Sequence, residues 1–105
     1  NTNAFIGRGA LAGLDLYRFD KCFMGVNGIH PLLGFTTPDQ EEAMVKQKAI
    51  AFSRETYVLA DNTKFAEISF AKIADINEAS IITNELDDET QQQYENRTTI
   101  KVVTS

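Results

Sequence analysis

The segment of residues 25–37 has the composition of a loop that binds an anion or a polar ligand. It reads Gly-Val-Asn-Gly-Ile-His-Pro-Leu-Leu-Gly-Phe-Thr-Thr and lies directly before an expected helix. Gly25 and Gly28 let the backbone approach a ligand closely, while Thr36 and Thr37 place hydroxyl groups beside the free N–H groups of that helix. The alternative is an ordinary strand-to-helix loop in which the glycines form turns and Thr37 only caps the helix. The loop matches neither a Walker motif nor the GxGxxG fingerprint, so its spacing by itself favours the alternative.

Two charged positions, Glu42 and Lys64, are placed to contribute to the same site. Glu42 lies in the first turn of the expected helix, where it either interacts with the helix dipole or accepts hydrogen bonds from sugar hydroxyls. Lys64 follows the next strand and offers a point charge for a phosphate, while Asp61 has the simpler role of capping a turn. A lysine, an acidic residue and a glycine-containing loop at one sheet edge predict a site for a small phosphorylated polyol.

Cys22 and His30, the only cysteine and the only histidine, argue against other chemistries. Cys22 is expected inside a buried strand, where it behaves as a small hydrophobic residue. A lone histidine without a second His or a Cys ligand is a poor metal site, and no nucleophile elbow is present. We therefore expect no metal, no cofactor and no catalytic residue. His30 either makes a polar contact at the mouth of the site or has no role.

An alternation of strands and helices predicts the scaffold that positions these residues. Short apolar strands are expected at residues 21–26, 57–60, 80–83 and 99–103, the first of them covered on both faces. A weak helix is expected at 9–16 and an acidic helix at about 87–96. This order is typical of a parallel α/β sheet with right-handed crossovers. Ligands bind such sheets beyond the carboxyl ends of the strands, here the segments 26–37, 61–66 and 83–88.

The main helix is expected to begin directly after the glycine-containing loop. Thr37 is the predicted N-cap, Pro38 suits the first helical position, and Gln40 stands where a capping-box partner belongs. Its apolar stripe for packing on the sheet consists of Val45, Ala49 and Phe52.

The net charge of the chain indicates which kinds of partner its surface can bind. The 105 residues include 15 acidic and 10 basic ones, for a formal charge of −5, and 43% are hydrophobic, which fits one domain with its own core. The acidic excess lies within residues 85–95, so the candidate site carries Lys46 and Lys64 on an otherwise neutral body. This balance argues against a surface that binds DNA phosphates. The apolar runs are too short to cross a membrane, and we expect a piece of a longer cytoplasmic protein.

Several motifs together resemble the effector domain of DeoR-type bacterial sugar-operon repressors, and most closely the repressors of fructose-type phosphotransferase operons. The resemblance covers nearly the whole chain. It rests on residues 5–7 with Ala10, 19–30 (with Gly25-Val26-Asn27-Gly28-Ile29-His30), 34–38, 42–43, 45–46, 59–65 (Leu59-Ala60-Asp61-Asn62-Thr63-Lys64-Phe65) and 81–84.

The resemblance implies a sugar-phosphate sensor on the fold shared by ribose-5-phosphate isomerase and glucosamine-6-phosphate deaminase. The expected architecture is a three-layer α/β domain with a parallel sheet of about four strands, forming the second half of such an effector domain. Glu42 and Lys64 occupy places similar to an acidic residue and a lysine of those enzymes, whereas the histidine of the deaminases is shifted to His30. The effector-binding residues are then predicted to be Asn27, Gly28, His30, Thr36, Thr37, Glu42, Asp61 and Lys64.

The winged helix-turn-helix of such repressors and the first half of the effector domain, with its Asp-x-Gly-Thr-Thr phosphate loop, have no counterpart in residues 1–105. We therefore expect a partial sensing domain that reaches operator DNA only through the missing N-terminal part. The strand at 21–26 is expected to present an open edge and to favour a homo-oligomer. The leading function is regulatory binding of a phosphorylated sugar. The alternatives are an isomerase or deaminase-like enzyme, with Glu42 as base and Lys64 as phosphate or carbonyl contact, and a purely structural oligomerisation piece.

Overall fold

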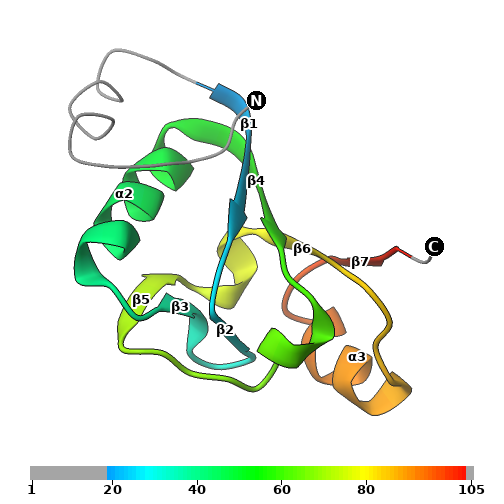
Figure 1. Ribbon diagram of the computed structural model, residues 1–105. Helices are drawn as coiled ribbons and strands as arrows, with labels where there is room; N and C mark the ends of the chain where they lie inside the picture. The colour runs from blue at the N-terminus through cyan, green and yellow to red at the C-terminus, as the bar shows by residue number, and fades with distance from the viewer. Residues whose placement is uncertain (1–18, 104–105) are drawn as a thin grey trace.

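The computed structural model describes residues 19–103, so the weak helix predicted at 9–16 lies outside the described residues. Two sheets, two α-helices and two short 3-10 helices make up this part of the chain (Figure 1). In chain order they are β1 (Phe19–Gly25), β2 (Gly28–His30), β3 (Gly34–Thr37), α2 (Gln40–Ala51), β4 (Ser53–Leu59), η1 (Asn62–Lys64), β5 (Ala71–Ala74), η2 (Ile76–Glu78), β6 (Ser80–Thr83), α3 (Asp88–Glu95) and β7 (Ile100–Val102).

The larger sheet is parallel and has the strand order β1-β4-β6-β7. This confirms the α/β class and the sheet of about four parallel strands. The predicted strand at 80–83 coincides with β6, and the acidic helix at 87–96 with α3. The strand predicted at 57–60 is the second half of β4, which begins at Ser53. Arg54 and Glu55 in the first half are exposed, so the sequence there lacks the apolar run of a buried strand.

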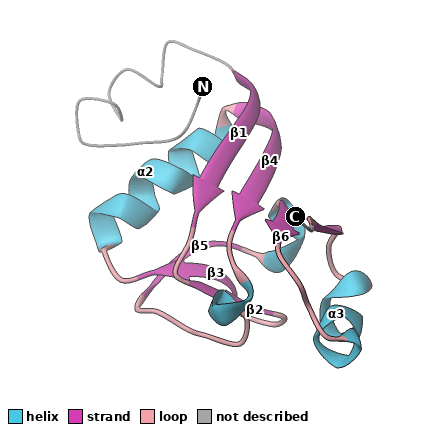
Figure 2. Ribbon diagram, turned by 45° about the vertical axis from the view of Figure 1, so that its right-hand side comes forward, coloured by secondary structure: helices cyan, strands magenta, loops and turns pink. Residues whose placement is uncertain are grey.

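A second, antiparallel sheet with the order β2-β3-β5 was not expected from the sequence. Its first two strands form a hairpin inside the segment 26–37, which was predicted to be a loop. The strands are only three and four residues long, too short for an alternating pattern to show. The sheet lies beyond the carboxyl ends of β1 and β4 (Figure 2), so the hairpin carries several candidate site residues.

The core is formed between the two sheets and the helices. The largest fully buried side chains include Tyr94 of α3, Phe35 of β3, Ile29 of β2 and Ile81 of β6. β1 differs from the prediction of a strand covered on both faces, because Cys22 and Met24 are buried while Phe23 is 36% exposed. Phe23 stacks instead on Tyr57 of the neighbouring strand, with ring centroids 5.2 Å apart.

The start of α2 also differs from the prediction. Asp39, not Thr37, is the N-cap, and its carboxylate accepts a hydrogen bond from the Glu41 N–H. Thr37 cannot cap because it is the last residue of β3, where it pairs with Ala71. The expected apolar stripe is present in Val45 and Ala49, which are buried, whereas Phe52 is the half-buried C-cap.

Tyr94 anchors α3 to the small sheet. Its hydroxyl donates a hydrogen bond of 3.0 Å to the Ile29 carbonyl, across 65 positions of the chain, and its ring meets Phe65 edge-on at 5.1 Å. Burial raises the pKa of Tyr94 above its usual value, so it remains a neutral donor. No helix of the described residues has the length and apolar character needed to cross a membrane.

We predict that Tyr94→Phe lowers the free energy of unfolding by about 1 kcal/mol, because the Ile29 carbonyl keeps only the Ala66 N–H as a donor. Urea unfolding of the chain measures the change. Tyr57→Phe is the matched control, since the Tyr57 hydroxyl binds the exposed Glu55 carboxylate, and its loss should leave stability unchanged. Equal effects in the two variants would contradict the anchoring role of Tyr94.

A second prediction concerns β1. In the described part of the chain β1 pairs with β4 on one side only, and an unpaired strand edge is a template for another strand. The homo-oligomer expected from the sequence therefore stays a prediction, which sedimentation velocity of the 105-residue chain over a range of concentrations checks. A monomer at every concentration would contradict it.

Candidate functional site

The loops that follow β1, β4 and β6 gather at one edge of the parallel sheet, as the carboxyl ends of parallel strands must. Gly25, Leu59 and Thr83 are the last residues of these strands. The edge is therefore built from the segments 26–37, 61–66 and 83–88 that the sequence indicated.

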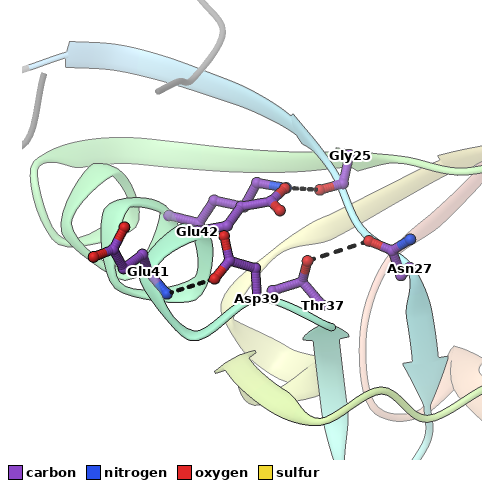
Figure 3. A network of polar contacts seen from close by, with 7 residues as sticks. Gly25, Asn27, Thr37, Asp39, Glu41 and Glu42 are labelled. Atoms are coloured by element: carbon purple, nitrogen blue, oxygen red, sulfur yellow. Dashed lines mark hydrogen bonds and ion pairs between the residues drawn. The ribbon is translucent and has the colours of Figure 1, made fainter. Parts of the chain in front are cut away.

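Five residues make polar contacts at the end of β1, and we call them the β1/α2 cluster: Gly25, Asn27, Thr37, Glu42 and Lys46. Figure 3 labels the first four of them. The Lys46 ammonium donates to the Gly25 carbonyl at 2.6 Å and to a Glu42 carboxylate oxygen at 2.7 Å. The Thr37 hydroxyl donates to the Asn27 side-chain oxygen at 3.2 Å. Three of the predicted site residues, Asn27, Thr37 and Glu42, are thus brought together.

Local structure explains this arrangement. Glu42 and Lys46 are four residues apart on α2 and therefore lie on the same face, one turn apart. The β2–β3 hairpin places Thr37 beside the loop after β1, since the Asn27 N–H bonds the Thr36 carbonyl at 2.9 Å. The cluster thus joins β1, β3 and α2.

The cluster offers hydrogen-bond acceptors rather than a charged anion site. The hydrogen bond from Lys46 lowers the pKa of Glu42, and the charge of Lys46 and a contact with Thr37 act in the same direction. Glu42 is therefore a carboxylate at neutral pH and can only accept hydrogen bonds. Asp39 and Glu42 also place negative charge at the start of α2, which disfavours a phosphate there and leaves sugar hydroxyls as the better partners.

Gly28 and Thr36 lie beneath the segment 66–70. A Cβ atom on Gly28 would stand 2.4 Å from the Glu67 carbonyl oxygen and 2.6 Å from the Thr36 hydroxyl oxygen. That hydroxyl accepts a hydrogen bond of 2.9 Å from the Ser69 N–H. The close approach that Gly28 permits is thus made by the chain's own backbone, and a contact of either residue with an effector remains a prediction.

His30 lies at the other end of the hairpin from Asn27 and Thr37. Its Nδ1 accepts hydrogen bonds from the N–H groups of Leu32 and Leu33 at 3.1 and 3.2 Å, which closes the turn between β2 and β3. At about 3.3 Å per residue, His30 is roughly 10 Å along the strand from Asn27. The structure therefore gives His30 a local role in the turn and does not bring it into the β1/α2 cluster.

Asp61 and Lys64 form a second group on η1. Asp61 is the N-cap of this turn and accepts hydrogen bonds from the N–H and the hydroxyl of Thr63, which lower the pKa of Asp61. This confirms the capping role considered from the sequence. The half-buried Lys64 is followed by Phe65, which pairs with Ile29 of β2. Within residues 19–103, no hydrogen bond or ion pair joins Asp61 or Lys64 to the β1/α2 cluster.

Asn62, Asn84 and Glu85 are edge residues that sequence reasoning did not select. The Asn62 N–H donates to the Asn84 side chain, and its side-chain amide donates to the Glu85 carbonyl, both at 2.8 Å. These bonds fasten the loops after β4 and β6 to each other. The only signal in the sequence was that both asparagines follow predicted strands.

An open pocket of about 520 Å³ lies next to the hydrogen bonds that Asn62 makes with Asn84 and Glu85. It offers two carboxylates and two amides but no basic group, so it does not suit a phosphate. Its lining residues are Asn62, Glu85, Leu86, Asp87, Gln91 and Val102.

No three His, Cys, Asp or Glu side chains within residues 19–103 come together as metal ligands would. Cys22 is buried, and burial raises the pKa of its thiol, as suits a hydrophobic core position.

Comparisons with known proteins agree on one family. Residues 1–85 match the model of the DeoR C-terminal sensor domain. The HTH-type transcriptional regulator FruR of Bacillus subtilis strain 168 is 51% identical over 102 residues, which cover 97% of this chain and 41% of that protein. The lactose phosphotransferase system repressor of Staphylococcus aureus strain N315 is 33% identical over 88 residues, 84% of this chain and 35% of the relative. The HTH-type transcriptional repressor GlcR of Bacillus subtilis is 34% identical over 76 residues, 72% of this chain and 29% of the relative.

We predict that Gly28→Ala lowers the free energy of unfolding by about 1–3 kcal/mol, because the new methyl group meets backbone that cannot move aside freely. Gly25→Ala is the matched control, since a Cβ there would meet nothing closer than the Leu59 carbonyl oxygen at 4.0 Å. Urea unfolding of both variants makes the comparison. If Gly28→Ala is as stable as Gly25→Ala, the segment 66–70 does not lie as close to Gly28 as described.

Proposed function

The chain belongs to the family of DeoR C-terminal sensor domains, and on this premise we propose that it is the effector-binding part of a transcriptional repressor of a sugar operon. A phosphorylated sugar binds at the carboxyl edge of the parallel sheet and changes the preference of the full-length protein for operator DNA. The effector favours one state of the repressor through its own contacts, as any allosteric ligand must.

The β1/α2 cluster is the observation that carries this proposal. An ionised carboxylate on Glu42, the Asn27 amide and the Thr37 hydroxyl stand together at the end of β1, where parallel sheets bind ligands. Such groups recognise sugar hydroxyls, which both donate and accept hydrogen bonds. Lys64 supplies the positive charge for the phosphate from η1, beside Asp61. Gly28, His30 and Thr36 complete the proposed effector-binding residues from the hairpin.

The rest of the protein is part of the same proposal. The chain spans 41% of FruR and smaller shares of the other relatives. Residues 1–105 are the sensing part, and a winged helix-turn-helix outside them contacts DNA. The charge of −5 supports this division, because DNA phosphates bind clustered Lys and Arg. The protein acts in the cytoplasm as a homo-oligomer.

A sugar-phosphate isomerase or deaminase is the second candidate, with Glu42 as the base. A general base works best with a pKa near the working pH. The hydrogen bond from Lys46 lowers the pKa of Glu42 and so makes it a weaker base. The relatives described above are named as regulators and repressors. Both observations favour a binding protein.

A thermal-shift panel of hexose and pentose phosphates on the full-length protein tests the proposal. A bound sugar phosphate stabilises the folded state and raises the melting temperature. We expect at least one compound to do so without being converted, as followed by chromatography of the mixture. Isomerised or deaminated product would establish the enzyme instead, and no shift with any compound would refute the effector class.

The site is tested by Lys64→Ala, which should weaken binding of the stabilising compound by about tenfold or more, because a charge-assisted phosphate contact is lost. Lys101→Ala on β7 is the control, since Lys101 is an exposed lysine on the last strand of the sheet. Titration calorimetry of both variants measures the affinities. Unchanged affinity in Lys64→Ala would show that the phosphate binds elsewhere.

A further inference from the structure

We propose that Lys46 is the positioning residue of the effector site: it holds the Glu42 carboxylate against the end of β1, where the sugar hydroxyls are to be bound. This inference rests on the proposed function and adds to it a residue that acts through another. Lys46 itself does not touch the sugar.

The contacts of Lys46 connect elements that are distant in sequence. Its ammonium group donates to the Gly25 carbonyl, 21 positions away, and to Glu42 on its own helix, at 2.6 and 2.7 Å. An ammonium has three N–H donors, so two of them fix the first turn of α2 to the end of β1.

Burial distinguishes this ion pair from the Lys72–Asp75 and Arg54–Asp20 pairs. The Lys46 side chain is only 12% exposed. By contrast, Lys72 and Asp75, three residues apart, form a pair that is 51% and 63% exposed. Exposed pairs contribute little because water screens them. The Lys46 pair is shielded on the lysine side, so its geometry is held more firmly.

The carboxylate, in contrast, faces outward. The Glu42 side chain is 44% exposed, so one side of the carboxylate is bound by Lys46 while the remainder reaches solvent. Thr37 contacts the same carboxylate and also donates to Asn27. Two hydrogen-bonded groups therefore meet at the end of β1: Lys46 with Gly25 and Glu42, and Thr37 with Asn27. Figure 3 shows Thr37 and its bond to Asn27 near the Glu42 side chain. A sugar that meets Glu42 and Asn27 finds both already oriented by groups behind them.

Lys46 also determines the pH below which the Glu42 carboxylate is protonated and no longer serves as an ionised acceptor. A carboxylate stops accepting as the pH falls through its pKa, and the bond from Lys46 keeps the pKa of Glu42 low. Without Lys46 that pKa rises toward its ordinary value. Effector binding that needs the carboxylate then fails at a higher pH than in the wild-type protein, a change that a purely structural role of Lys46 would not produce.

The test uses the full-length protein with Lys46→Met, which keeps the length of the side chain and removes its charge, and Lys46→Arg, which keeps the charge. Lys72→Met is the matched control, since Lys72 also pairs with a carboxylate but lies on β5. Each protein is titrated calorimetrically, from neutral to mildly acidic pH, with the compound of the hexose and pentose phosphate panel that most stabilises the wild type. Urea unfolding shows that each variant is folded.

We expect Lys46→Met to weaken binding about tenfold or more and to move its loss to higher pH. Lys46→Arg should recover most of the affinity, and Lys72→Met should bind as the wild type does. A double-mutant cycle with Glu42→Gln isolates the mechanism: if Lys46 acts through Glu42, Lys46→Met costs little further affinity in the Glu42→Gln background. Should Lys46→Met fail to fold, Lys46→Gln takes its place in the same comparison.

Two outcomes overturn the inference while the proposed function stands. One is wild-type affinity and wild-type pH dependence in Lys46→Met, and the other is an equal loss with and without Glu42. A wild-type protein that binds no sugar phosphate at all overturns the proposed function, and the role of Lys46 with it.

Discussion

The backbone carbonyl of Ile29 is the point on which the architecture depends. It accepts a hydrogen bond from the Ala66 N–H at 2.7 Å and another from the Tyr94 hydroxyl at 3.0 Å. These two bonds attach the segment after η1 and the helix α3 to the same residue of β2. A fully buried carbonyl must be satisfied, and here the two donors come from parts of the chain 37 and 65 positions away. The hairpin that carries Asn27 and Thr37 is thereby held beyond the ends of the parallel strands.

The same packing separates the candidate residues into groups. Asn27, Thr37 and Glu42 meet around Lys46, while Asp61 and Lys64 lie on η1, fastened to the next loop through Asn62. The first group offers acceptors and the second a positive charge. In the function proposed above, the hydroxyls of a phosphorylated sugar meet the first group and its anionic group meets Lys64.

Local signals in the sequence were sufficient where the structure is local. Strand β6 and helix α3 follow directly from an apolar run and an acidic first turn, and Asp61 caps the turn that its type predicted. The cap of α2 was assigned two residues early, because a threonine before a proline resembles an N-cap as well as an aspartate does. Only the pairing of Thr37 with Ala71, 34 positions later, excludes Thr37 as the cap.

The sequence by itself determined the α/β class, the parallel sheet and the edge at which ligands are expected, because strand and helix patterns are written in neighbouring residues. Only the tertiary structure showed the antiparallel sheet and the separation of His30 from the β1/α2 cluster. It also showed that the chain's own backbone occupies the space beside Gly28. The antiparallel sheet needs β5, and the space at Gly28 is filled by the backbone of Glu67, both more than 30 positions away along the chain. His30 is the exception, because its partners Leu32 and Leu33 are near neighbours in the chain. Hydrogen-bond partners separated by 20 or more positions leave no pattern in a single sequence. The sequence therefore named Asn27, Thr37 and Glu42 among its candidates, but only the fold showed which candidates lie together.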